Sequence, residues 1–238
     1  MNQPQNAALA KSRIMMVDDH PIVREGLMRF LNTQPDLDAC CEAGNIAEAL
    51  HVVAQHVPAL VIIDISLKEE SGLSLIQTLR HKYSSLGLLA MSQHDESVFA
   101  ERALRAGANG YLMKQSATSH ILLAVRQVLA GHVYLSAAMQ SRLSQQLLSG
   151  QRGNASSSGS SAQPGLLASL SEREFEVLHL LGLGFSTRQI AEQLKRSIKT
   201  IESHRASLKD KLKLDSGTEL THFAFQMAAQ IGPATPNT

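Results

Sequence analysis

The chain has little or none of several residue types. Its 238 residues include no tryptophan, only two cysteines and 4% aromatic side chains. Two cysteines exclude a fold held together by several disulfides, and so few aromatic residues offer little to line a lipid-sized cavity. The formal net charge is only +1, which excludes a uniformly basic surface. Any contact with nucleic acid must therefore be local.

Long apolar runs are also missing. Although 44% of the residues are hydrophobic, no run is long enough to cross a membrane, and the first residues lack the apolar core of a signal peptide. We therefore expect a cytoplasmic protein without a membrane partner. Cys40 and Cys41 are adjacent in a predicted strand, where successive side chains point to opposite faces. No disulfide between them is expected, and they are interpreted as small hydrophobic residues.

Four short apolar runs each end at a polar or charged side chain and precede a helical pattern, as the parallel strands of an open α/β sheet do. The runs are Ile14 to Val17, Leu60 to Ile63, Leu86 to Met91 and Tyr111-Leu112. The residues that close them are Asp18 and Asp19, Asp64, Ser92 and Lys114. Because the carboxyl ends of parallel strands meet at one edge, the pattern predicts one shared polar site.

Three carboxylates, a hydroxyl and an ammonium suggest a particular chemistry. Like charges held together need a cation, and an oxygen-rich cluster suits Mg²⁺, which commonly bridges carboxylates to a phosphate. Asp64 is then the candidate nucleophile for an aspartyl-phosphate. An isolated Asp-Asp pair is more often a helix cap in a solvated turn, and Tyr111 alone could be a core aromatic. The joint order of the residues favours the phosphoryl site.

At these residues the chain resembles the receiver domain of two-component response regulators. The matching segments are Val17 to Pro21, Val61 to Leu67, Met91-Ser92 and Ala106 to Lys114. The resemblance implies an α/β fold over residues 12–133, with a doubly wound five-stranded parallel sheet of order 2-1-3-4-5. It also implies that a histidine kinase phosphorylates Asp64.

The same resemblance assigns roles to the other residues of the site. Mg²⁺ would be held by Asp18, Asp19, Asp64 and the backbone carbonyl of Ser66. Ser92 and Lys114 would grip the phosphoryl group, and Tyr111 falls on the switch aromatic of the family, which swings inward when Ser92 moves.

The chain departs from the common receiver pattern at two positions. Lys68 and Gln115 stand where many receivers have proline, and the first change leaves the following loop freer. We hypothesise altered kinase recognition or phosphoryl lifetime. Ser66 and His94 occupy positions that in the family tune how water reaches the phosphoryl group. Dephosphorylation rates of the Ser66→Ala and His94→Ala variants would test that role.

A break in composition follows the predicted receiver. Residues 149–165 are mostly Gly, Ser, Gln and Asn, which predicts a flexible linker. The preceding stretch, Ala137 to Leu148, is weakly amphipathic and suits a connecting helix. We therefore predict a connecting helix and linker over residues 134–167, followed by a second domain at residues 168–232.

The second domain has a wholly helical pattern of four helices. Three sequences predict capping boxes, and a fourth helix begins near Ser197. The boxes are Ser171 with Glu174, Ser186 with Gln189, and Ser216 with Glu219. A short helix from Ser186 to Leu194, a turn at Lys195-Arg196 and a longer helix form a helix-turn-helix. On the longer helix Ile198, Ile201, Leu208 and Leu212 form an apolar stripe.

The long helix is strongly basic on its other side, with seven Lys or Arg against two acidic residues between 195 and 213. A solvated basic face is the simpler interpretation for an isolated helix. The segment from 168 to 230 resembles the LuxR-type output domain, and the whole chain is similar to the NarL/FixJ group of transcription regulators. That resemblance implies phosphate contacts by Lys199, Thr200, His204, Arg205 and Lys209. It places Glu202, Ser203 and Ala206 at the positions that contact bases.

Glu202 stands where relatives often have lysine, so we predict a different half-site. The last helix, from Thr218 to Gln230, is expected to pack in its own domain through Leu220 and Phe223. The family pairs two domains on DNA through this helix, so outer residues such as Phe225 or Met227 are candidate dimer contacts.

The sequence thus predicts a phosphorylation-gated, DNA-binding transcription regulator. Its expected cofactor is Mg²⁺, and its expected partners are a histidine kinase, double-stranded promoter DNA and a second copy of the chain on activation. It is not expected to turn over an external substrate, since a phosphatase-like enzyme would need a general-acid Asp where Ser66 stands. The complete set of acceptor-site residues disfavours a module that no longer accepts phosphate. The scarcity of aromatic residues disfavours a regulator with an autoinducer pocket.

Overall fold

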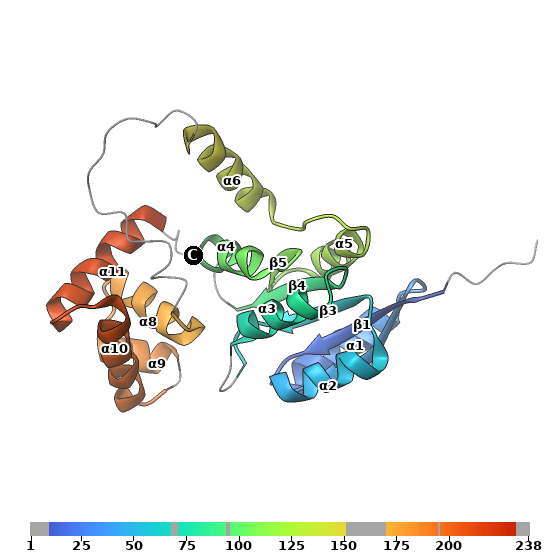
Figure 1. Ribbon diagram of the computed structural model, residues 1–238, viewed down its shortest axis with the longest axis horizontal. Coiled ribbons are helices and arrows are strands. Elements are labelled where there is room, and N and C mark those ends of the chain that lie inside the picture. Colours follow the sequence, from blue (N-terminus) through green and yellow to red (C-terminus); the bar gives the residue numbers. More distant parts are fainter. Residues whose placement is uncertain (1–9, 68–70, 94–95, 151–169, 195, 232–238) are drawn as a thin grey trace, which may run out of the picture. The chain divides into compact units, whose positions relative to one another are not determined.

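The computed structural model describes residues 10–67, 71–93, 96–150, 170–194 and 196–231. The chain divides after Gly150 into two compact units, which Figure 1 draws in blue to yellow and in orange to red. Lys68, His94 and residues 151–165 of the predicted linker lie outside the described residues, whereas Ser149 and Gly150 belong to a helix. No helix of the described part has both the length and the apolar character needed to span a bilayer.

The first unit contains a five-stranded parallel sheet of order β2-β1-β3-β4-β5, which confirms the predicted topology. The strands are β1 (Ser12–Val17), β2 (Leu37–Ala43), β3 (Leu60–Asp64), β4 (Gly87–Ser92) and β5 (Gly110–Met113). Every residue of the central strand β3 is buried. Its uninterrupted apolar sequence follows from cover on both faces of the sheet.

Helices pack on both faces of this sheet (Figure 1). They are α1 (Pro21–Asn32), α2 (Ile46–His56), α3 (Gly72–Lys82), α4 (Glu96–Ala106) and α5 (Thr118–Leu129). Leu31 of α1 and Val125 of α5 share one apolar cluster with Ile14 and Met16 of β1. Helices α1 and α5 therefore cover the same face, and the other face is left for α2, α3 and α4.

Strand β2 contains a bulge at its cysteines. Ile14 pairs with Ala39 and Met15 pairs with Cys41, so Cys40 is the additional residue in the strand. The two Sγ atoms lie only 3.2 Å apart, although both thiols are free. The expectation that the two side chains point to opposite faces is therefore wrong, because the bulge interrupts the alternation of the strand.

The chain after α5 returns to the edge of the sheet. The Tyr134 amide donates to the Asn109 carbonyl at 2.9 Å, and the Tyr111 amide donates to the Tyr134 carbonyl at 3.1 Å. The Ser136 amide donates to Glu96 Oε1 of α4 at 2.9 Å. These bonds hold the start of the connecting helix α6 (Ala137–Gly150) against the sheet and α4.

The second unit has four helices in the described residues: α8 (Glu172–Gly182), α9 (Thr187–Gln193), α10 (Ile198–Leu212) and α11 (Gly217–Ile231). Capping boxes start α8 and α9, as predicted, and the Ser197 side chain caps α10. At α11 the Ser216 hydroxyl accepts the Glu219 amide. Glu219 itself accepts the Asp215 amide at 2.9 Å rather than that of Ser216, so the third box is incomplete.

Two predicted placements in this unit are wrong. Ile201, Leu208 and Leu212 are buried, but Ile198, the first residue of α10, is 47% exposed. Met227 is buried, whereas Phe225 is 65% exposed. Only Phe225 of these two therefore lies at the outer edge of α11.

Candidate functional site

The predicted acidic residues gather at the carboxyl end of the sheet. Asp18 and Asp19 follow β1, Asp64 ends β3, and one ligand atom from each lies within 4.8 Å of the others. His20 belongs to the same group, with its Nδ1 atom 2.9 Å from Asp19 Oδ1 and 3.1 Å from Asp18 Oδ1. Its contribution was missed, although its position directly after the Asp pair was a signal for it.

Lys114 joins the ends of three strands. Its Nζ atom lies 2.6 Å from Asp18 Oδ2 and 2.7 Å from Asp64 Oδ2. The side chains of Lys114, Asp18 and Asp64 are 8%, 0% and 1% exposed. The Lys114 amide also donates to the Ser92 carbonyl at 2.6 Å, which fixes Lys114 beside the end of β4. Charges this well buried interact strongly because little water screens them.

The electrostatics of the site reflect this burial. Burial raises the pKa of Asp64, and the nearby Lys114 ammonium only partly offsets this effect. Burial by itself would lower the pKa of Lys114, but its attraction to Asp64 and Asp18 is larger in sum and raises it. Two buried carboxylates thus share one ammonium, an arrangement that favours the approach of a further cation.

The donor set fits Mg²⁺. Asp18 Oδ2 and Asp19 Oδ1 are buried without an aligned hydrogen bond, even though Lys114 and His20 nitrogens lie 2.6 and 2.9 Å away. Neither contact is a well-aligned hydrogen bond, so both oxygens keep capacity for a metal ion. Carboxylate oxygens beside an open, hydrated position are the ligands that Mg²⁺ prefers.

The backbone after β3 is folded closely around Asp64. The Ser66 amide donates to Asp64 Oδ1 at 3.0 Å, and the Gly72 amide donates to the Ile65 carbonyl at 3.0 Å. A Cβ atom on Gly72 would collide with the Asp64 carbonyl oxygen. Gly72 is therefore part of the site's support, and single-sequence reasoning missed it because glycine has many uses.

Ser92 and Tyr111 lie on the next two strands. Both residues are fully buried; Ser92 ends β4, and Tyr111 pairs in register with Ala90 of that strand. Tyr111 is thus on the inside of the fold, which is compatible with a core role and with the inward position of a switch residue.

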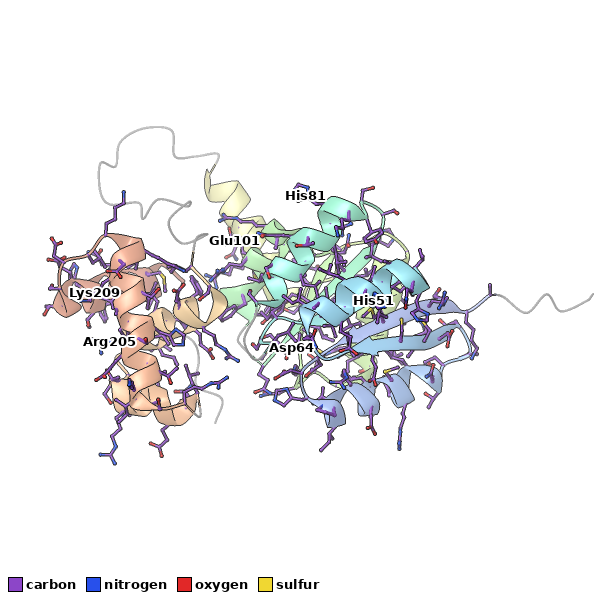
Figure 2. The ribbon with its side chains drawn as sticks, turned by 60° about the horizontal axis from the view of Figure 1, so that its bottom comes forward. His51, Asp64, His81, Glu101, Arg205 and Lys209 are labelled. Carbon is purple, nitrogen blue, oxygen red and sulfur yellow. The ribbon has the colours of Figure 1, made fainter. Side chains whose placement is uncertain are left out.

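The second group of predicted site residues lies on α10. Lys199, Glu202, Ser203 and Ala206 are exposed, opposite the buried Ile201, Leu208 and Leu212. Figure 2 labels Arg205 and Lys209 along the same helix and Asp64 beside the sheet of the other unit. The exposed side of α10 therefore carries the small and charged residues that the sequence placed there.

Three of the predicted phosphate contacts are partly engaged within the domain. The Arg205 guanidinium donates to the Thr187 hydroxyl at 2.5 Å, and the Thr200 hydroxyl lies 2.8 Å from that of Ser197. Burial lowers the pKa of His204, which leaves the ring neutral at physiological pH. Of the predicted phosphate contacts, Lys199 is exposed and Lys209 is partly exposed, so both ammonium groups are available to a phosphate.

Each of the two units matches a known protein family. Residues 14–126 match the response regulator receiver domain, and residues 168–224 match the bacterial regulatory proteins of the luxR family. The transcriptional activator protein ExaE of Pseudomonas putida is 40% identical over 90% of this chain and 95% of its own length. The oxygen regulatory protein NreC of Staphylococcus epidermidis is 32% identical over 90% of this chain and 97% of its own.

Solved structures show the same folds. A LuxR-family two-component response regulator from Aurantimonas sp. SI85-9A1 has 31% identity and a TM-score of 0.55 over 58% of this chain and 99% of its own. RcsB of Salmonella enterica serovar Typhimurium, bound to the promoter rprA with the phosphomimetic BeF3-, has 24% identity and a TM-score of 0.52 over 90% of this chain and 98% of its own.

Proposed function

The chain belongs to the response regulators that join a receiver domain to a LuxR-type DNA-binding domain, and we propose that phosphorylation of Asp64 switches its binding to promoter DNA. The observation that carries the proposal is the position of Lys114 between the buried Asp18 and Asp64 carboxylates. The three carboxylates at this sheet edge would hold Mg²⁺, and the ion together with the Lys114 ammonium would neutralise a transferred phosphoryl group.

Each residue of the site has a role in this proposal. Asp18, Asp19, Asp64 and the Ser66 carbonyl would hold Mg²⁺, which supplies positive charge to the phosphoryl oxygens when bound. A carboxylate oxygen of Asp64 attacks phosphorus while the bond to the donor histidine of the kinase breaks. Ser92 and Lys114 then hold the remaining phosphoryl oxygens. Because the acceptor is a residue of the chain itself, the protein turns over no external substrate.

The switch follows from the charge added at Asp64. A group of about −2 charge draws Lys114 and Ser92 towards it. We propose that Tyr111 keeps or regains its inward position in that state, and that the surface of α4 and β5 changes with it.

The exposed side of α10 is the proposed recognition surface. Lys199, Lys209, Thr200, His204 and Arg205 would contact phosphates, and Glu202, Ser203 and Ala206 would reach base edges in the major groove. Two copies would bind two half-sites, with Phe225 of α11 a candidate for their contact. Because its proposed partner is promoter DNA, we place the action of the protein in the cytoplasm.

Phosphorylation and DNA binding are tested on the purified full-length chain. With Mg²⁺ and acetyl phosphate, we expect the wild type and Asp36→Asn to become phosphorylated and Asp64→Asn to remain unmodified. Asp36 is a matched control because its carboxylate is half-exposed and pairs with Arg126, away from the acidic cluster. Selection of genomic fragments with and without the donor then reports the operator. Phosphorylation of Asp64→Asn, or equal operator binding with and without the phosphodonor, would contradict the proposal.

A further inference from the structure

One buried carboxylate of the second unit lies directly behind the exposed side of α10. Glu174 is in the first turn of α8 and is 5% exposed. Its Oε1 atom accepts the Ser207 hydroxyl of α10 at 2.5 Å, and its Oε2 atom accepts the Lys211 ammonium of α10 at 2.7 Å. Oε2 also accepts the Ser171 amide at 2.7 Å, which completes the capping box of α8.

These bonds hold α10 at two points one helical turn apart. Ser207 directly follows Ala206, one of the exposed residues, and Lys211 lies four residues further along the same flank. The buried side of α10 is apolar, and apolar contacts are not directional. Two bonds to one fixed carboxylate do restrict both the rotation of the helix and its position along its axis.

The carboxylate itself has little freedom to move. The capping box fixes Glu174 to the first turn of α8, and the Ser171 amide, the Ser207 hydroxyl and the Lys211 ammonium share its two oxygens. Bonds of this kind to an ionised group are short and strong. They also lower the pKa of Glu174 to about 2, so the group is charged at every physiological pH.

We propose that Glu174 is a positioning residue for DNA recognition, which sets the register of α10 so that Glu202, Ser203 and Ala206 meet base edges. The inference rests on the proposed DNA binding and adds a residue outside the DNA-facing surface. Base contacts tolerate errors of only about 0.5 Å in the positions of the contacting groups. Phosphate contacts made by long, flexible side chains tolerate more, so loss of Glu174 should reduce sequence discrimination more than affinity for DNA in general.

The test compares Glu174→Gln with Glu219→Gln in the full-length, phosphorylated chain. Both glutamates are the third residue after a capping serine, and both substitutions remove one negative charge. The Glu219 carboxylate, however, bonds its own loop at the Asp215 amide. Fluorescence anisotropy measures binding to the selected operator and to an unrelated duplex of equal length, at one salt concentration and at a temperature where circular dichroism shows both variants folded.

We expect Glu174→Gln to lose about tenfold in operator affinity while its affinity for the unrelated duplex stays within about twofold, because the phosphate contacts remain. Glu219→Gln should keep the wild-type ratio of the two affinities. A merely structural role would lower both affinities together, since only the folded fraction would change. If Glu174→Gln keeps the wild-type ratio of the two affinities, which includes an equal fold loss on both duplexes, the inference is overturned.

A milder variant decides the matter if Glu174→Gln does not fold. Ser207→Ala removes one bond to Glu174 and keeps the capping box and the Lys211 pair. It should lower the ratio about threefold, and a wild-type ratio in this variant would overturn the inference. A wild-type chain that prefers no duplex at all would instead overturn the proposed function, and the inference with it.

Discussion

The Lys114 ammonium lies 2.7 Å from the Asp64 carboxylate, and each side chain is at most 8% exposed. Replacement of Lys114 by methionine would leave Asp18 and Asp64 without their shared cation. We expect a loss of about 3 kcal/mol in the free energy of unfolding, most of which excess Mg²⁺ restores. Urea unfolding, monitored by tyrosine fluorescence, measures this loss of stability. The signal reports on the first unit because all three tyrosines, Tyr83, Tyr111 and Tyr134, lie there. Lys82→Met, at an exposed position, is the control. A Lys114→Met chain whose unfolding free energy does not change with Mg²⁺ would contradict this account.

Gly72 and Gly26 allow a matched pair of substitutions. A methyl group at Gly72 would collide with the Asp64 carbonyl oxygen, whereas nothing lies within 4 Å of the corresponding position at Gly26 in α1. We expect Gly72→Ala to lose at least about 2 kcal/mol in stability and to accept phosphate poorly. Gly26→Ala should be neutral or more stable by up to about 1 kcal/mol. The same unfolding and phosphorylation assays test both, and equal behaviour of the two variants would argue against the close packing at Asp64.

The Glu174 carboxylate makes the stability of the second unit depend on pH in the acidic range. Its pKa is lowered from 4.5 to about 2 in the folded chain, chiefly by its bonds to Lys211 and Ser207, which outweigh burial. Its contribution is therefore full above pH 4.5 and is lost as the pH falls towards about 2. The difference in unfolding free energy between wild type and Glu174→Gln, measured by circular dichroism, should shrink over that range. A difference independent of pH would show that the charge of Glu174 is not what stabilises the fold.

Glu202 is exposed on α10 and offers only acceptor oxygens. A carboxylate can accept from the cytosine amino group, whereas a lysine donates to the acceptors of guanine. We expect Glu202→Lys to change the preferred base at one position of each half-site in a binding-site selection. Asp210→Lys makes the same change of charge at another exposed position of α10 and should leave the selected base unchanged. An identical motif for wild type and Glu202→Lys would show that Glu202 does not contact bases.

The polar cluster at the carboxyl end of the sheet was predictable because its signals are local and repeated. Asp18, Asp64, Ser92 and Lys114 each follow an apolar run, and parallel strands bring such positions to one edge whatever the loops do. The helix starts at Ser171, Ser186 and Ser197 were predictable for a similar reason, since a cap involves residues only three positions apart. Both kinds of pattern can be recognised without knowing which elements pack together.

The features that sequence reasoning missed depend on contacts between distant parts of the chain. The bulge at Cys40 is set by how β2 pairs with β1, and nothing in either strand alone marks it. Which apolar residues of α10 and α11 are buried depends on how these helices contact α8, and Ile198 is exposed whereas Met227 is buried. The bonds of Glu174 to α10 likewise join residues more than thirty positions apart, so the capping box revealed only half of its role.

The bulge at Cys40 and the bridge at Tyr134 lie on opposite sides of the receiver sheet. The bulge interrupts the regular pairing of the edge strand β2 with β1, and the Tyr134 bridge occupies part of the open side of β5. A β-sheet with regular free borders invites strand addition and aggregation. With these irregularities at both edge strands, the sheet is poorly suited to joining another sheet edge to edge. We therefore expect any self-association of the chain to use its helical surfaces.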